Sequence, residues 1–173
     1  DVTVCKGNSA TVTLTPGVGS IVKWNTSSSS ASGPYSSMSS SSNTFTINNI
    51  VTKLWVTATS KNGVCAEATT TTPVVIDVRE LPTASISGST TICSGATATL
   101  NVTVNNTFGN SWTIDYLEGV TSKTLTGTGS TATITTSNLT TKTDVTLQKI
   151  TMNNTSSSSN PNCGPTTLSS TVT

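Results

Sequence analysis

The sequence contains no histidine and few charged or aromatic residues. Charged residues make up 9% of its 173 residues and aromatic residues 4%, and the formal net charge at pH 7 is +1. Without histidine, the chain lacks the side chain that proteins use most often as a general base and as a zinc ligand. A weakly charged chain also lacks the basic surface that binds nucleic acid. We therefore expect no catalytic residues, no metal, no cofactor and no nucleic-acid partner.

Long apolar runs are absent too. No stretch reaches the ~18–20 consecutive apolar residues of a transmembrane helix, so we expect no membrane contact. Asp1 opens a strand-like pattern rather than a signal peptide. These features predict an internal piece of a longer exported protein.

Hydroxylated residues dominate what remains, with 28 serines and 40 threonines. Threonine and valine are β-branched and suit a pleated, half-buried surface better than a helix. Short alternating runs bounded by turn residues recur along the chain, and no window keeps a 3.6-residue period. The sequence therefore predicts an all-β fold.

Four cysteines are present: Cys5, Cys65, Cys93 and Cys163. They are too widely spaced to form the close pairs of a structural zinc site, so disulfides are the favoured interpretation. Disulfides imply an oxidising, extracytoplasmic compartment. Four cysteines allow three pairings.

An internal repeat is the strongest signal in the chain. Cys5 and Cys93 each begin a Cys-x-Gly motif before an alternating threonine-rich strand, and Trp24 and Trp112 follow them at the same distance. Each copy then closes with a second cysteine. The repeat length suits a self-sufficient β-sandwich. We therefore predict two tandem immunoglobulin-like β-sandwich domains, 1–80 and 81–173, with Trp24 and Trp112 in their cores.

The repeat also suggests a disulfide pattern. Both cysteines occupy equal places in both copies, which predicts one internal bridge in each domain. The predicted pairs are Cys5–Cys65 and Cys93–Cys163.

Trp55 is the candidate binding residue. Leu54, Val56 and Ala58 share one face of a predicted strand, so Trp55 points to the other face. An exposed tryptophan can stack on a sugar or anchor a partner, with Tyr35 nearby in the same copy. The alternative is that Trp55 packs under the serine-rich loop predicted over Thr26–Ser42.

Carboxylates offer little further chemistry. Asp115 and Glu118 lie three residues apart on a predicted strand and therefore face opposite sides, which argues against a catalytic pair. Asp77 and Glu80, joined by Asp115 or Glu118, are the only candidates for a calcium site at the domain junction, and a solvated junction is favoured over a metal.

The sequence resembles the immunoglobulin-like and PKD-like repeats of very large surface proteins of Bacteroidetes. The residues that carry the resemblance are Val4-Cys5-Lys6-Gly7, Leu14, Trp24 and Gly63-Val64-Cys65, then Ile92-Cys93-Ser94-Gly95, Leu100, Trp112 and Asn162-Cys163. The threonine-rich, low-charge style is similar to that of the giant adhesins of gliding motility. The resemblance implies type IX secretion and a cell-surface location, with no catalytic residues.

We therefore expect a structural stalk or spacer module of an adhesin, whose partners are the neighbouring repeats of the same chain and, beyond them, surface polysaccharide or other cell-surface proteins. One alternative is a carbohydrate- or surface-binding module. Another is an accessory domain of a secreted hydrolase.

Overall fold

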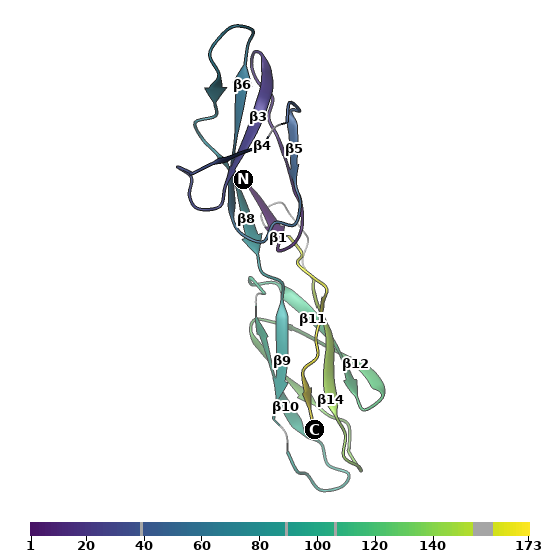
Figure 1. Ribbon diagram of the computed structural model, residues 1–173. Helices are drawn as coiled ribbons and strands as arrows, with labels where there is room; N and C mark the ends of the chain where they lie inside the picture. Colours follow the sequence, from purple (N-terminus) through teal and green to yellow (C-terminus); the bar gives the residue numbers. More distant parts are fainter. Residues whose placement is uncertain (39, 89, 106, 154–160) are drawn as a thin grey trace. The chain divides into compact units, whose positions relative to one another are not determined.

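The computed structural model describes residues 1–38, 40–88, 90–105, 107–153 and 161–173. Every regular element in these ranges is a β-strand, from β1 to β16 (Figure 1). The strands form two compact units. Among the described residues, the first comprises Asp1–Arg79 and Pro161, and the second begins at Glu80 and takes in the C-terminal segment Asn162–Thr173. The all-β prediction is confirmed, and the described residues include no helix able to span a bilayer.

The first unit is a two-sheet sandwich. Its larger sheet has the order β1, β8, β6, β3, β4, with β7 paired to β6, and its smaller sheet pairs β2 with β5. The strands are β1 (Val2–Cys5), β2 (Ala10–Thr13), β3 (Ser20–Ser27), β4 (Ser36–Met38), β5 (Thr44–Ile47), β6 (Leu54–Lys61), β7 (Ala68–Thr69) and β8 (Val74–Arg79). The first strand pairs in parallel with β8, and the other pairs are antiparallel. This arrangement of strands is immunoglobulin-like.

The core of the first unit is built around Trp24, which is 1% exposed. Its ring stacks on Phe45 from the opposite sheet, with centroids 5.5 Å apart. The indole N–H donates to the backbone carbonyl of Ser42 at 3.0 Å, so the polar end of the buried ring is satisfied. Ile21 and Ile76 complete the centre of this core.

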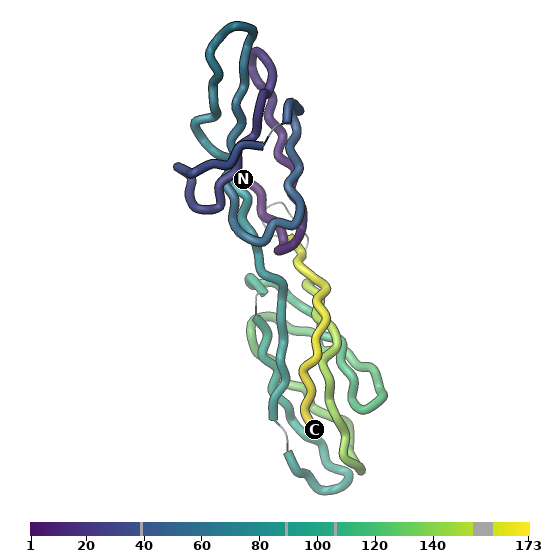
Figure 2. The backbone as a smooth tube through the Cα atoms, in the orientation of Figure 1, coloured from purple at the N-terminus to yellow at the C-terminus, as the bar shows by residue number. Residues whose placement is uncertain are grey.

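The second unit is also a two-sheet sandwich, but its first strand, β9, pairs antiparallel with β10, whereas β1 pairs in parallel with β8. One sheet has the order β13, β10, β9, and the other has the order β12, β11, β14, β15, with β16 also paired to β14. The strands are β9 (Thr83–Ser87), β10 (Thr99–Asn105), β11 (Ser111–Glu118), β12 (Thr121–Thr128), β13 (Thr131–Thr135), β14 (Val145–Met152), β15 (Thr166–Thr167) and β16 (Thr171–Val172). Within this unit the C-terminal segment runs beside β14 and β9 (Figure 2).

Strict alternation builds the core of the second unit. On β11, Trp112, Ile114 and Tyr116 point inward and are buried. Trp112 is fully buried, and its indole N–H donates to the carbonyl of Gly129 at 2.9 Å. Gly127 lies opposite Trp112 in the β11–β12 register.

The predicted disulfide pairs are wrong. Cys5 and Cys163 are the bonded cysteines, which gives a single disulfide, Cys5–Cys163. Cys65 and Cys93 are exposed free thiols. Each predicted pair therefore contains one cysteine that forms no bridge.

In the first unit, the physical reason is strand direction. Cys5 pairs with Arg79 in the parallel β1–β8 ladder, beyond the residues of β8 that pair with the start of β6. Cys65 follows the other end of β6, in the turn after Lys61. The eight residues of β6 span roughly 25 Å. A disulfide requires Cα atoms within about 7 Å.

The second unit separates its two cysteines in the same way. Gly164, next to Cys163, approaches Ile150 and Pro82, and Pro82 lies just before β9. Cys93 follows the opposite end of β9. An internal bridge would have to span this strand as well.

The serine-rich segment Thr26–Ser42, predicted as a loop, contains β4, which pairs with β3. Position 39 of this segment lies outside the described residues. The strand forms because Ser36 and Ser37 align with Thr26 and Asn25, and the Ser37 hydroxyl donates to the Asn25 side chain at 2.8 Å.

Replacing Gly127 by alanine is expected to destabilise the second unit. An added Cβ would lie 2.6 Å from the Trp112 ring, and the fully buried ring has little freedom to move. Overpacking of this kind costs about 1–3 kcal/mol. Urea unfolding measures the change. Gly17→Ala is the control, since a Cβ there meets nothing within 4 Å. Equal midpoints for both variants would contradict the prediction.

Candidate functional site

Trp55 lies on β6, paired with Ser27 and Val75, on the face of the sheet opposite the core. The residue is half-buried. The Lys53 ammonium sits 5.5 Å from the centroid of its ring and also forms a 2.7 Å ion pair with Asp77. Trp55 is therefore engaged by a cation–π contact.

Tyr35 and Trp55 do not line the same cavity. Tyr35 lines a hydroxyl-rich cavity of about 400 Å³ in the first unit, which Trp55 does not line. Its hydroxyl donates to the carbonyl of Ala31 at 2.7 Å, which fixes the ring at the cavity wall. The two aromatic residues therefore do not form one stacking platform.

The floor of this cavity is polar and buried. Asn25 is 7% exposed, and its side-chain amide donates to the hydroxyls of Thr57 and Thr59 at 3.4 Å. Lys23 also lines the cavity and forms a 3.2 Å ion pair with Glu67. A wall of hydroxyl and amide groups with one aromatic ring has the chemistry to hold a neutral polyhydroxylated ligand.

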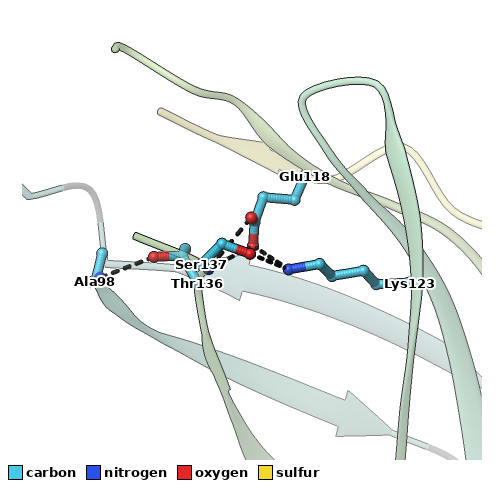
Figure 3. Close-up of polar contacts among 5 residues, drawn as sticks. All are labelled: Ala98, Glu118, Lys123, Thr136 and Ser137. Atoms are coloured by element: carbon cyan, nitrogen blue, oxygen red, sulfur yellow. Dashed lines mark hydrogen bonds and ion pairs between the residues drawn. The ribbon is translucent and has the colours of Figure 1, made fainter. Parts of the chain in front are cut away.

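Glu118 is the most unusual ionisable residue of the second unit. It continues the inward register of β11, and its side chain is 6% exposed. Lys123 donates to its carboxylate at 3.0 Å, and the backbone N–H of Ser137 donates to both carboxylate oxygens at 3.1 and 3.2 Å (Figure 3). Lys123 also donates to the Ser137 hydroxyl at 2.6 Å. The carboxylate therefore fastens the segment after β13 to strands β11 and β12.

The pKa of Glu118 reflects two opposed effects. Burial raises the pKa of the carboxyl group. The hydrogen bonds from Lys123 and Ser137 and the charge of Lys123 together lower the pKa by more than burial raises it, so the net pKa lies below its usual value. Burial also raises the pKa of the neighbouring Tyr116. An ionised, fully bonded carboxylate is suited to hold strands together and unsuited to accept a proton from a substrate.

Other carboxylates have structural partners as well. Asp115 pairs with Lys149 at 2.8 Å on the opposite face of β11 from Glu118. Asp77, a calcium candidate from the sequence, is held by Lys53. Within the described ranges, no three cysteine, aspartate or glutamate residues gather into a metal-binding group.

A larger cavity of about 520 Å³ lies in the second unit, next to Cys93. Its walls mix hydroxyl groups, apolar side chains and one ammonium group. They include Ile92, Ser94, Leu100, Leu139, Lys142 and Val145. Sequence reasoning identified Cys93 as a disulfide cysteine and missed this cavity, because the cavity forms where the segments before β10 and β14 meet Val172 and Thr173 in the fold.

Comparison with known proteins finds no matching family model and no matching curated protein. Among solved structures, a two-domain fibronectin type III segment of chicken tenascin is 14% identical, covers 96% of this chain and 93% of its own, and has a TM-score of 0.38. A chain of a 1.5-MDa bacterial ice-binding adhesin is 15% identical with a TM-score of 0.41, and the match covers 99% of this chain and 60% of that one. At such scores the fold assignment rests on the strand order itself.

The Glu118 cluster predicts a pH-dependent effect of Glu118→Gln. A lowered folded-state pKa means that the carboxylate stabilises the fold above its unfolded pKa, near 4.5, and loses this effect as the pH falls through the folded value. The variant should lose about 1.5–3 kcal/mol at pH 7, because hydrogen bonds to a charged group are lost. The difference from wild type should shrink as the pH falls below the unfolded pKa and through the lower folded-state pKa.

Thermal unfolding between pH 2.5 and 7 measures this difference. Asp115→Asn is the matched control, since the exposed pair with Lys149 contributes only about 0–1 kcal/mol. Glu118→Gln unfolding like wild type at pH 7 would show that the cluster contributes nothing.

Proposed function

We propose that this chain is a non-catalytic structural module of a large secreted bacterial adhesin, exposed at the cell surface. The observation that carries the proposal is the presence of two immunoglobulin-like sandwiches in tandem with the same cysteine-turn and buried-tryptophan plan. Sandwiches joined in series lengthen a protein without catalytic or ligand-binding residues, which is what a stalk requires.

The use of the charged side chains supports this proposal. Four lysines pair with four carboxylates, in Lys23–Glu67, Lys53–Asp77, Lys123–Glu118 and Lys149–Asp115. These groups are engaged in holding strands, which leaves little of the described chain for acid–base chemistry. The fold therefore supports a non-enzymatic role.

The disulfide supports an extracytoplasmic location, since structural disulfides persist in oxidising compartments. Together with the resemblance to Bacteroidetes surface repeats, it supports delivery by type IX secretion and a role in gliding motility and attachment. Neighbouring repeats are the expected partners within the parent chain.

A stalk bears tension, and the disulfide predicts how this one responds. Cys5–Cys163 encloses almost the whole chain, so a force applied at the two termini loads the bond and the short terminal strands β1, β15 and β16, and the enclosed segment carries no load. Pulled in the oxidised state, the chain should gain almost no length. After reduction, both sandwiches should unfold and release roughly 3.3–3.6 Å per residue.

Single-molecule force extension with and without a reductant measures this response. Cys5→Ser should extend fully in both conditions and is the control. Equal extension of the wild-type chain before and after reduction would count against a load-bearing role for the disulfide.

A second candidate function is carbohydrate binding, which the cavity beside Tyr35 favours. Neutral oligosaccharides would place hydroxyl groups against Asn25 and Thr57 and a sugar face against the ring. Under this alternative, Tyr35→Ala should abolish chemical-shift changes on titration with bacterial surface polysaccharide fragments. Trp55→Ala, on β6 but outside the cavity, should leave them intact. Absence of shifts in the wild-type chain would remove this candidate.

A further inference from the structure

The two free cysteines occupy the positions of the two bonded ones. Cys5 and Cys93 are presented by the same turn: their carbonyls accept from the residues three positions on, Asn8 at 2.9 Å and Ala96 at 3.0 Å. In each turn the glycine two residues after the cysteine has φ near +85°, at +85° in one copy and +84° in the other. Cys93 therefore has the same position in its turn as Cys5 has.

The same glycines anchor both turns to the loop before the long strand. Gly7 N–H donates to Ile50, and Gly95 N–H donates to Leu139, both at 2.8 Å. The match extends from the residue types to the hydrogen-bond pattern, so the turn itself is a repeated structure.

Cys65 and Cys163 match in the same way. Each stands three residues before a two-residue strand that pairs antiparallel with the long strand of its unit, β7 with β6 and β15 with β14. Cys65 therefore takes the place of Cys163. The bonded pair joins a cysteine of the first type, Cys5, to one of the second type, Cys163.

We propose that Cys93 and Cys65 form disulfides of this same type with further repeats of this kind. Cys93 would accept a second-type cysteine, and Cys65 would accept a first-type cysteine. The inference extends the proposed function, because it names the partner of each free thiol. Every repeat would then be joined covalently to the one before it and the one after it.

The surfaces around the two thiols are complementary. The turn that carries Cys65 also carries Val64, whose side chain is fully exposed. The cavity beside Cys93 is about 520 Å³ and is partly apolar, with Leu139 and Ile92 in its walls. An exposed apolar side chain next to a thiol gains burial when it enters such a cavity. Cys65 therefore lies beside an exposed apolar side chain, and Cys93 lies beside a partly apolar cavity that would bury such a side chain.

The bond can form by thiol–disulfide exchange with a low-molecular-weight disulfide. The Cys93 thiolate attacks that disulfide, forms a mixed disulfide and releases one small thiolate. The thiolate of a second-type cysteine then attacks the Cys93 sulfur and releases the other small thiolate. Two protein thiols are oxidised and one small disulfide is reduced to two small thiols, which take up the two protons that the protein thiols lose.

Two copies of this chain test the inference, because Cys65 of one copy is a second-type cysteine for Cys93 of another. Cys65→Ser keeps only Cys93 free, and Cys93→Ser keeps only Cys65 free. Each variant alone and an equimolar mixture are incubated with oxidised glutathione and separated without reductant. Peptide mapping first verifies that each variant retains the Cys5–Cys163 bond.

The expected result is a heterodimer joined through Cys93 and Cys65, formed in clear excess over either homodimer. Adding Val64→Asp to the Cys93→Ser variant should slow this cross-linking several-fold if Val64 enters the cavity. Three outcomes would each overturn the inference: homodimers as abundant as the heterodimer, mixed disulfides with glutathione alone, or a cross-linking rate unchanged by Val64→Asp. Such a result would leave the force response of the Cys5–Cys163 loop, and with it the proposed stalk function, untouched.

Discussion

Burial of one tryptophan in each sandwich is the constraint on which the rest of the structure depends. Aromatic residues make up only 4% of the chain, so Trp24 and Trp112 supply a large share of the buried area of their cores. Burial of an indole requires a partner for its N–H group, and the carbonyls of Ser42 and Gly129 fill that need. The ring therefore fixes where the chain must turn back across each sandwich, and in the second unit it also requires a glycine at position 127.

Threonine side chains link neighbouring strands in this chain, a role that ion pairs have in more highly charged sandwiches. Directly paired threonines on neighbouring strands bond through their hydroxyls, in Thr11–Thr46 at 2.8 Å, Thr59–Thr69 at 2.9 Å and Thr146–Thr171 at 3.0 Å. Each residue also offers a methyl group to the face of the sheet. Such cross-strand pairs contribute roughly 0.2–1 kcal/mol apiece and do not depend on pH or salt. A surface rich in threonine can therefore remain nearly uncharged and still hold short edge strands.

Alternation made the strands and the all-β class predictable, because side chains on a strand face opposite sides with a fixed period. The repeat placed both cysteines at matching positions, but matching positions do not determine pairing. Pairing depends on which end of the sandwich each cysteine occupies, and that depends on strand direction. Cys5 ends β1, which runs parallel to β8, whereas Cys65 follows β6, which runs antiparallel to β8. No local pattern reports this difference.

For the candidate sites too, local sequence patterns predict some features, and the others depend on the tertiary structure. Glu118 could have been identified, since it continues the inward register of Trp112, Ile114 and Tyr116, and an inward carboxylate requires partners. Its partners, Lys123 and the Ser137 N–H, come from segments whose approach only the folded sandwich defines. Trp55 was predicted to face away from the core, but Lys53 covers part of its ring. Four of the few carboxylates are bound by lysines from neighbouring segments, and the thiols of Cys65 and Cys93 are exposed.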